Sequence, residues 1–341
     1  MSTWAAILAG GAGVRFWPLS TPDRPKQLLP LAGGRPLLVE AVERLRGLVP
    51  PERILILTGP LVADRIAEAV PQVPRDQILV EPRPASTAPA LVWAAQQIAA
   101  REPGGGGAQM LSLHADWAVG DDVAFRAAAA HALAVAREHD VLVTVGVKPT
   151  RNETGYGYIV PGPPLGSARR VRRFVEKPSA ARAALLRRRG ALWNTGLFAW
   201  GVARFLGEAA AHARELRPAW PALAAGDAAG FFAAAHPVAV DVAVLERTRR
   251  LAVVAGTFRW DDIGSWDALL RIRPRDARGN VVVGNVRLGD DVRDSVVWAE
   301  NEDLTVVGVA ATIVVRANGH TLVMPTGRAE HLKRLLQGGH D

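Results

Sequence analysis

A glycine-rich turn followed by two basic residues is the part of this sequence whose residue types and spacing point most directly to chemistry. Three glycines follow a short apolar run near the N-terminus: Gly10, Gly11 and Gly13. Glycine lets backbone N–H groups come close to a phosphate because it has no Cβ. Arg15, which can grip a phosphate with two donors, and Lys26, which supplies a point charge, come next. This order of residues predicts a nucleotide-binding turn.

The glycine pattern differs from the two common phosphate-binding motifs. A P-loop needs four residues between its glycines and then Lys-Ser or Lys-Thr, and the dinucleotide fingerprint needs G-x-G-x-x-G. The sequence has neither at this place. A tight surface turn followed by solvated basic residues is the alternative interpretation. Arg15, two residues after the last glycine, and the triplet Pro25-Lys26-Gln27 favour the nucleotide.

The stretch from Leu8 to Leu29 resembles the signature of the sugar-nucleotide pyrophosphorylases, the nucleotidyltransferases that join an NTP to a sugar 1-phosphate. Trp17-Pro18-Leu19-Ser20 and Pro25-Lys26-Gln27 are most similar to the mannose-1-phosphate guanylyltransferase branch of that family. The resemblance continues through further motifs in the family's order over roughly residues 4–286. It implies a set of nucleotide-binding positions: Leu8, Gly10, Gly11, Gly13, Thr87 and Ala88.

Two aspartates are candidates for a metal site. Asp116 follows a buried apolar run, and a carboxylate there can ligate Mg²⁺ while phosphate oxygens complete the shell, although such an Asp is as often a helix cap or solvated. Asp261 and Asp262 lie in an aromatic, glycine-rich turn where they could cap the next helix. The resemblance implies that Asp116 and Asp262 are both metal ligands and that Mg²⁺ is the cofactor.

A second group of polar residues is expected to bind the sugar phosphate. A lysine before a proline, as in Glu176-Lys177-Pro178, presents a directed ammonium, although most lysines are merely exposed. Asn194 offers an amide donor and acceptor for a sugar hydroxyl, or else it forms an Asn-Thr-Gly turn. The resemblance implies that Lys177 binds the sugar phosphate and that Gly155, Glu176 and Asn194 lie along the sugar.

The resemblance implies a complete reaction. GMP is transferred from GTP to an α-hexose 1-phosphate, with mannose 1-phosphate expected, and pyrophosphate is released. The sugar phosphate is largely dianionic at neutral pH, because the second pKa of a phosphate monoester is near ~6, so no general base is required. Arg15, Lys26 and Lys177 are the catalytic residues that this implies. A related enzyme with another NTP or hexose, a non-catalytic sugar-nucleotide sensor and a nucleic-acid binder are the alternatives.

The pattern of apolar residues predicts an α/β fold. Strand-like runs alternate with helical ones through the first 150 residues, which is typical of a mostly parallel sheet flanked by helices, and the resemblance makes this a Rossmann-like nucleotidyltransferase fold. Strands are expected at 4–8, 54–58, 78–80, 110–113 and 141–147 and helices at 37–48, 62–70, 88–100 and 124–137. Ligands bind beyond the carboxyl ends of the strands in such sheets. A glycine run at 104–107 is expected to link a helix to the next strand.

The pattern changes in the last part of the chain. Short β-branched runs, joined by Gly, Asn and Asp turns, are expected to form strands at 280–286, 295–298, 304–307, 312–315 and 321–324, before a helix at 331–336. This predicts a small β domain at 278–341, which could be a few coils of a β-helix, after a catalytic domain at 1–277. We expect no room for the isomerase domain that some relatives carry.

Composition limits the classes of protein to which the chain could belong. The 341 residues include no cysteine, which excludes disulfides and thiolate metal sites. No apolar stretch approaches ~20 residues and the N-terminus lacks a basic signal region, so we expect a cytoplasmic protein without membrane segments. The net charge of +8 suits small anionic substrates, and its arginines are scattered, so nucleic acid is not expected as a partner. A homodimer is expected from the resemblance.

Some positions depart from the family pattern. Ala85 and Ser86 stand where Arg and Asn are usual, and His114 and Trp117 replace Pro and His around Asp116. Fewer side-chain donors near the base predict that GTP remains preferred by a smaller margin, because unpaired polar groups are what reject the wrong base.

Overall fold

The chain folds into two compact units. The computed structural model describes residues 2–11, 13–102, 107–336 and 338. The first unit contains Met1–Gly10, Ala41–Ala115 and Val119–Trp260, and the second contains Gly11–Glu40, Asp116–Ala118 and Asp261–Asp341. The chain therefore passes between the units several times. The predicted boundary at 277/278 follows sequence pattern rather than this division, and it stays a prediction.

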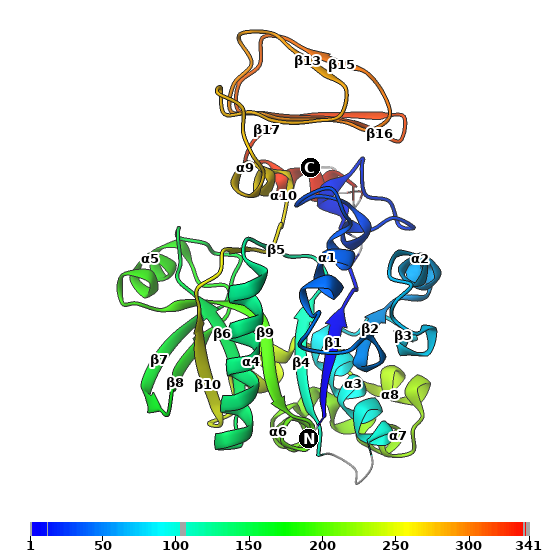
Figure 1. The fold of residues 1–341 in the computed structure, drawn as a ribbon, viewed down its shortest axis with the longest axis vertical. Coiled ribbons are helices and arrows are strands. Elements are labelled where there is room, and N and C mark those ends of the chain that lie inside the picture. Colours follow the sequence, from blue (N-terminus) through cyan, green and yellow to red (C-terminus); the bar gives the residue numbers. More distant parts are fainter. Residues whose placement is uncertain (1, 12, 103–106, 337, 339–341) are drawn as a thin grey trace. The chain divides into compact units, whose positions relative to one another are not determined.

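The first unit is built on a mixed sheet (Figure 1). In the described residues its strand order is β3-β2-β1-β4-β9-β6-β10-β8-β7. The strands are β1 (Thr3–Leu8), β2 (Ile54–Thr58), β3 (Ile78–Val80), β4 (Gln109–His114), β6 (Leu142–Val147), β7 (Tyr158–Leu165), β8 (Ala168–Val175), β9 (Leu192–Gly201) and β10 (Leu251–Gly256). A separate short ladder pairs β5 (Ala118–Val119) with β11 (Trp260–Asp261).

Most strands of this sheet run in one direction. β1 pairs in parallel with β2 and β4, and β6 pairs in parallel with β10. β9 is antiparallel to both β4 and β6, between which it lies, and β8 is antiparallel to β10 and β7. The central strands are buried along most of their length, as expected for near-continuous apolar segments covered on both faces. The predicted mixed, mostly parallel α/β sheet is confirmed.

Helices cover the sheet. α4 (Asp122–His139) packs against β6, β9 and β10, whereas α3 (Thr87–Arg101) packs against β1, β2 and α6 (Figure 1). The other helices of this unit are α2 (Ala63–Ala69), α5 (Ala180–Arg188), α6 (Val202–His212), α7 (Trp220–Ala224) and α8 (Ala228–Ala234). The Asp121 side chain caps α4 by accepting from Val123 N and Ala124 N, which explains where that helix begins.

The segment from Val202 to Val238 belongs to the core of the first unit. Its Ala- and Leu-rich sequence predicts surface helices. These helices do expose one side to solvent, whereas Phe205, Leu216 and Phe231 are fully buried in one cluster with the side chains of α3. Large apolar side chains at helical spacing determine which face of the helices enters the core.

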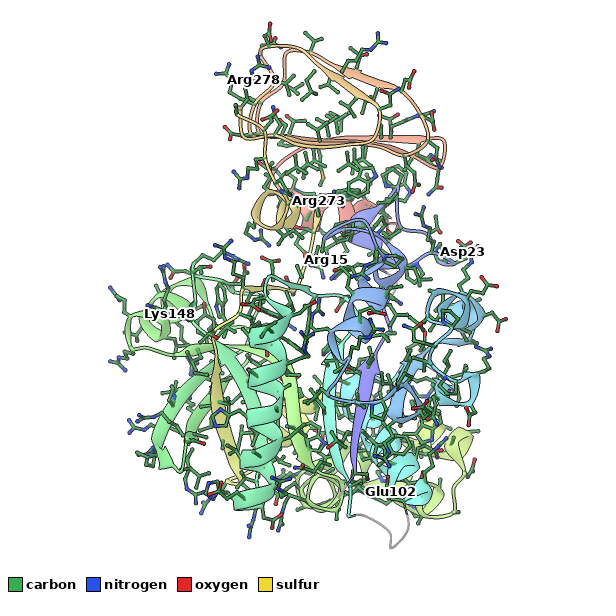
Figure 2. All side chains as sticks on the ribbon, in the orientation of Figure 1. Arg15, Asp23, Glu102, Lys148, Arg273 and Arg278 are labelled. Atoms are coloured by element: carbon green, nitrogen blue, oxygen red, sulfur yellow. The ribbon has the colours of Figure 1, made fainter. Side chains whose placement is uncertain are left out.

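The second unit has its own core. The residues from Phe16 to Leu37 pack against Trp266 and against strands of the C-terminal region. The indole of Trp266 donates to the carbonyl of Trp17 at 3.1 Å and packs against the Phe16 ring at 5.2 Å between centroids. Arg273, labelled in Figure 2, donates to the carbonyls of Pro30, Leu31 and Gly33. A segment near the N-terminus and the C-terminal strands are thus parts of one unit.

The C-terminal strands are stacked as parallel coils. β12 (Val281–Val283), β14 (Val296–Ala299) and β16 (Thr312–Ala317) pair in parallel, and β13 (Val286–Leu288) pairs in parallel with β15 (Leu304–Val306). β17 (His320–Pro325) returns antiparallel to β16 and leads to α10 (Ala329–Leu336). The predicted β region with the character of a short β-helix is confirmed.

Two local predictions were wrong. The helix expected at 37–48 ends earlier, as α1 (Leu37–Arg44). Residues 45–48 form a turn instead, in which Leu48 N donates to the Leu45 carbonyl and Gly47 has a φ of +81°. The strand expected at 280–286 is two strands, β12 and β13, separated by Gly284 at a φ of +90°. The short α9 (Leu269–Ile272) was not predicted.

Other predictions are untouched by the structure. No helix in the described part of the chain is both long and apolar enough to cross a bilayer. The glycine run expected to link a helix to a strand lies, apart from Gly107, outside the described residues. The homodimer and the cytoplasmic location stay predictions.

Candidate active site

Lys26 is held in place by the glycine turn that precedes it. Gly13 adopts a φ of +58°, and a Cβ on it would lie 2.6 Å from the Lys26 Cβ and 2.9 Å from the Lys26 backbone nitrogen. The Ser20 hydroxyl donates to the Gly13 carbonyl at 2.9 Å and fixes the turn from the other side. Lys26 itself is buried, with only 7% of its surface exposed. A glycine is therefore required at position 13 so that the backbone of Lys26 can approach the turn.

We expect Gly13→Ala to destabilise the protein and Gly10→Ala to leave it nearly unchanged. An L-residue in the left-handed region costs roughly 1–2 kcal/mol, and the contact with Lys26 adds to that cost. A Cβ on Gly10 meets no atom within 4 Å, so this variant is a matched control. Urea unfolding would show a loss of at least about 2 kcal/mol for Gly13→Ala alone. Equal unfolding free energies for the two variants would contradict the role given to Gly13.

The Lys26 ammonium joins the two aspartates that the sequence analysis placed at a metal. Its Nζ donates to Asp116 Oδ2 at 2.9 Å and to the Asp262 backbone carbonyl at 2.5 Å. The three residues belong to the second unit, although Asp116 and Asp262 lie 90 and 236 positions from Lys26 in the sequence. The structure thus brings together a buried cation and two residues with carboxylates, a combination suited to phosphates and a divalent cation.

The turn that presents Asp262 is unusual and firmly held. Ile263 has a φ of +47°, which is rare for a β-branched residue and marks a conformation imposed by its surroundings. The neighbouring Asp261 is buried, binds Arg271 through two hydrogen bonds of 2.7 and 3.0 Å, and accepts from Ile263 N. Asp261 therefore shapes the turn, and its neighbour Asp262 is the candidate for chemistry.

The donors present fit Mg²⁺. No group of three or more acidic or histidine side chains in the described residues is arranged as a complete metal cage. Mg²⁺ is usually held by one or two carboxylates, with substrate phosphates and water supplying the other ligands. Asp116, whose side chain is 34% exposed, offers a carboxylate beside Lys26. Asp262 contacts Lys26 through its backbone carbonyl, its own carboxylate accepts from Gly264 N at 3.1 Å through Oδ1, and Oδ2 is the oxygen that it would offer to a cation. The set matches a cation that arrives with a nucleotide rather than a permanent protein-bound ion.

Arg15 lies on the short helical turn after Gly13. Its side chain is 42% exposed and is 3.4 Å from Glu330 Oε1 on α10. Such a pair contributes little to stability, and a ligand phosphate could compete for the guanidinium. Gly11, at a φ of +105°, is exposed, and a Cβ there would meet no atom within 4 Å.

The other predicted nucleotide-binding positions lie in the first unit, at the end of a parallel strand or in the segments that follow one. Leu8 ends β1 and accepts from Ala115 N at 2.9 Å, and Gly10 follows it. Thr87 begins α3, where its hydroxyl accepts from Val240 N, and Ala88 N donates to the Val238 carbonyl. The Thr87 hydroxyl oxygen and the Ala88 N–H therefore already have hydrogen-bond partners within the protein. This region would contact a ligand mainly through van der Waals packing.

Glu81 is a candidate that the sequence analysis did not select. It follows β3 in the same unit, and burial raises the pKa of its carboxyl group to about 7. Perturbed carboxyl groups are enriched in functional sites because burying a charge is costly unless a ligand compensates for it. The only indication in the sequence was a glutamate directly after an apolar strand. That pattern is too common to identify a functional residue.

The sugar-site candidates of the first unit lie around Glu176. A Cβ on Gly157 would be 2.6 Å from Glu176 Oε2, so this glycine makes room for the carboxylate. Lys177 is exposed, has a φ of +42°, and its Nζ lies 3.4 Å from Glu176 Oε1. Burial raises the pKa of Glu176, and the nearby Lys177 opposes that shift. The Gly155 amide donates to Glu153 Oε1 at 3.1 Å, so this N–H is used within its own loop.

Asn194 is the centre of a hydrogen-bond chain. Its Oδ1 accepts from the Thr144 hydroxyl at 2.8 Å and from Gly196 N at 3.2 Å, and its Nδ2 donates to Asp241 Oδ1 at 2.9 Å. Its backbone N–H donates to the Gly157 carbonyl at 2.9 Å. The Asn-Thr-Gly sequence therefore lies within strand β9 rather than in a hairpin turn. Asp241, in the turn Asp241–Leu245, was not predicted as a polar partner of Asn194.

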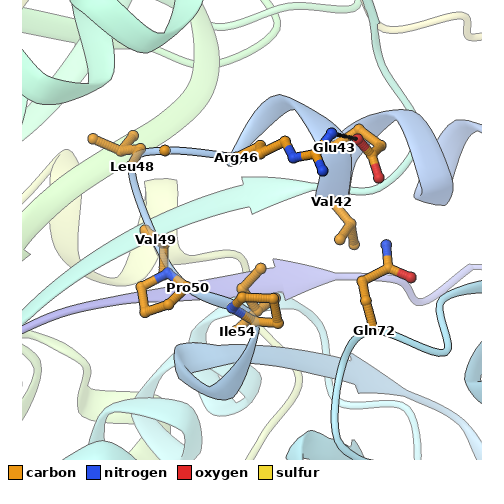
Figure 3. Close-up of a pocket in the computed structure, with 10 residues that line it drawn as sticks. Val42, Glu43, Arg46, Leu48, Val49, Pro50, Ile54 and Gln72 are labelled. Carbon is orange, nitrogen blue, oxygen red and sulfur yellow. Dashed lines mark ion pairs between the residues drawn. The ribbon is translucent and has the colours of Figure 1, made fainter.

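A surface pocket in the first unit lies away from these residues. It has a volume of about 550 Å³ and is lined by residues 42–43, 46–51, 54 and 72 (Figure 3). Ile54 begins β2, whereas the nucleotide-binding candidate Leu8 pairs with Leu57 near the other end of that strand. None of the predicted site residues lines the pocket, and we assign it no part in the reaction.

The chain is similar to known proteins over most of its length. The nucleotidyl transferase family profile matches residues 4–279. A mannose-1-phosphate guanylyltransferase from Sinorhizobium fredii is 33% identical over 97% of this chain and 67% of its own length. The xanthan biosynthesis protein XanB from Xanthomonas campestris is 35% identical over 97% of this chain and 72% of its own length.

A solved structure extends the comparison to the whole fold. A crystal structure from Thermus thermophilus, described as a mannose-1-phosphate geranyltransferase, is 35% identical, covers 99% of both chains and has a TM-score of 0.89. The family profile, the long relatives and this structure all match the region that contains Lys26, Asp116, Lys177 and Asp262. The chain therefore belongs to the nucleotidyl transferase family and is a nucleotidyltransferase of the sugar-nucleotide pyrophosphorylase type.

Proposed function

We propose that the protein transfers GMP from GTP to α-D-mannose 1-phosphate and releases pyrophosphate. The observation that carries this proposal is the contact of the buried Lys26 ammonium with both Asp116 and Asp262. The names of the long relatives supply mannose 1-phosphate and the guanylyl group as the first substrates to test.

The chain's residues would promote the reaction by positioning and by charge. The sugar phosphate is already a good nucleophile as a dianion, so the protein has to align it with the α-phosphorus and stabilise the charge that develops on the leaving pyrophosphate. Lys177 would hold the attacking phosphate. Arg15 and Lys26 would stabilise the pyrophosphate. Mg²⁺, held by Asp116 and Asp262, would supply charge neutralisation at the reacting phosphates.

Glu81, which follows β3 and precedes residues 85–88, would suit guanine as the base. Guanine presents its N1–H and its 2-amino group side by side, and one carboxylate can accept from both, whereas adenine has neither donor at those positions. Glu81 must be ionised to accept both hydrogen bonds, and burial raises its pKa to about 7. The preference for GTP over ATP should therefore increase between pH 6 and pH 8, as Glu81 loses its proton.

A substrate panel tests the proposed function directly. Each of four NTPs would be combined with several hexose 1-phosphates, with inorganic pyrophosphatase added and phosphate release measured. We expect GTP with mannose 1-phosphate to give the highest kcat/KM. A higher kcat/KM for another pair would assign the protein to a different member of the same enzyme class. No turnover with any pair would contradict the enzymatic proposal.

We expect the discrimination between GTP and ATP to be moderate and to increase in Ser86→Asn. Ser86 is exposed and stands where the family pattern has asparagine, and an amide there would add donors beside the base. Ala85 is fully buried in the core, so an arginine there would be forced into apolar surroundings and is not a useful variant. The ratio of kcat/KM for GTP and ATP should rise about 5- to 100-fold in Ser86→Asn. A wild-type ratio above about 10⁴ that stays unchanged would show that position 86 does not set base choice.

A further inference from the structure

Asp241 fixes the orientation of the Asn194 side-chain amide by accepting a hydrogen bond from it. The Asn194 Oδ1 accepts from Thr144 Oγ1 and from Gly196 N, so both of its acceptor sites are used by the protein. The amide nitrogen must then face Asp241, to which it donates at 2.9 Å. One N–H of the amide remains after this bond. Asn194 can thus donate to a ligand hydroxyl, but it has no acceptor to offer.

Asp241 supplies the acceptor that Asn194 lacks. It begins a π-helical turn, Asp241–Leu245, and irregular turns of this kind are frequent at functional sites. The charged groups that face it are Glu176 and Lys177, which follow β8, and Glu246 lies at the end of its own turn. A carboxylate has about four acceptor positions, of which Asn194 takes one at Oδ1 and the residue's own backbone N–H takes another. The remaining positions can accept from a hydroxyl group.

We propose that Asp241 is a specificity-determining residue for the sugar, which holds the Asn194 amide in position and accepts a hydrogen bond from a hexose hydroxyl. This inference rests on the proposed transfer to a hexose 1-phosphate. An amide donor and a carboxylate acceptor that are fixed to each other can bind the O–H and one lone pair of a single hydroxyl, or one group on each of two neighbouring hydroxyls. In an epimer, one hydroxyl lies on the other side of the sugar ring and cannot form hydrogen bonds with both Asn194 and Asp241. The pair therefore discriminates by stereochemistry rather than by size.

The ionised form of Asp241 is expected to lower the stability of the fold. Burial, followed by the repulsion from Glu176, raises the pKa of Asp241 to about 7, while Lys177 and the Asn194 hydrogen bond oppose the shift. A carboxyl group whose folded pKa is raised stabilises the fold below its unfolded pKa, and this contribution is lost as the pH rises toward 7. The ionised side chain is therefore kept at a cost in stability. That cost is expected of a residue that serves a ligand rather than the fold.

Asp241→Asn is the decisive variant. The asparagine Oδ1 can still accept from Asn194, but the charge and the stronger acceptor are lost. We expect the KM for mannose 1-phosphate at pH 8 to rise about 10- to 100-fold while the KM for GTP stays within twofold. The preference for mannose 1-phosphate over glucose 1-phosphate and galactose 1-phosphate should narrow by a similar factor. The melting temperature at pH 8 should be unchanged or higher, because no buried charge has to form.

The pH dependence separates this role from a structural one. At pH 6 the wild-type Asp241 is mostly protonated and resembles asparagine, so the ratio of the variant's KM to the wild-type KM should be smaller at pH 6 than at pH 8. Titration of the substrate phosphate affects both proteins equally and cancels in this ratio. Asp140→Asn is the matched control, because Asp140 is an exposed aspartate of the same unit at a φ of +49° that asparagine accepts readily. It should leave substrate choice unchanged.

Three results would overturn the inference. The first is a KM for mannose 1-phosphate within twofold of wild type in Asp241→Asn. The second is an equal loss of activity for all three hexose 1-phosphates together with a lower melting temperature. The third is a KM ratio that is the same at pH 6 and pH 8. A wild-type protein that turns over none of the hexose 1-phosphates would instead refute the proposed function itself.

Discussion

Replacing Asp116 or Asp262 by asparagine is expected to lower turnover at least about a thousandfold at saturating GTP and mannose 1-phosphate, which corresponds to about 4 kcal/mol of lost transition-state stabilisation. An amide is a poor Mg²⁺ ligand because it lacks the carboxylate charge. Both variants should remain folded, since asparagine is nearly isosteric and its Oδ1 at position 116 could still accept from Lys26. Steady-state kinetics over a range of Mg²⁺ concentrations, with thermal melts in parallel, would measure both effects.

The metal role of each aspartate can also be tested without turnover. Mn²⁺ binding in the presence of GTP, followed by electron paramagnetic resonance, should weaken in both variants. Asp290→Asn is a matched control from the same unit, because the Asp290 side chain is almost fully exposed and pairs only at the surface with Arg278. Normal Mn²⁺ binding and turnover in Asp116→Asn or Asp262→Asn, with an unaltered melt, would remove that residue from the metal site.

Replacing Lys26 and replacing Lys177 are expected to change different kinetic constants. Lys26→Met keeps the aliphatic stem that packs near Gly13 but loses the charge beside the leaving pyrophosphate, so kcat should fall about 100- to 1000-fold with little change in the KM for the sugar phosphate. Lys177→Ala removes an exposed ammonium, so the KM for mannose 1-phosphate should rise about tenfold or more with the melting temperature unchanged. Initial rates with each substrate varied in turn would separate the two patterns.

Two kinetic results would contradict the roles given to Lys26 and Lys177. If Lys177→Ala leaves kcat and the sugar phosphate KM within about twofold of wild type, that lysine does not hold the attacking phosphate. If Lys26→Met mainly raises the KM for mannose 1-phosphate, the two roles are exchanged. Arg204→Met is a suitable control for charge removal in general, because Arg204 pairs with the exposed Asp140 and is not a predicted site residue.

The local parts of this protein were determined by its sequence. Strands β2 and β3 were predicted with their observed ends, because short apolar runs between turn residues have few other stable conformations. The glycine turn at Gly11 and Gly13 was predicted from residue type, and both glycines adopt positive φ angles that other residues avoid. The family could be recognised for the same reason: its motifs are short, contiguous and rich in residues with special backbone requirements.

Tertiary structure alone decided which of these local parts meet. β9 lies antiparallel between β4 and β6, a pairing that no neighbouring pattern in the sequence indicates. Lys26 meets Asp116 and Asp262 across 90 and 236 residues, and Asn194 meets Asp241 across 47. The pKa of Glu81 is raised by burial, which depends on packing around the end of β3 and not on its neighbours in the sequence. Contacts at such separations are selected by the packing of the whole fold, because their loop-closure entropy is balanced only when the core forms.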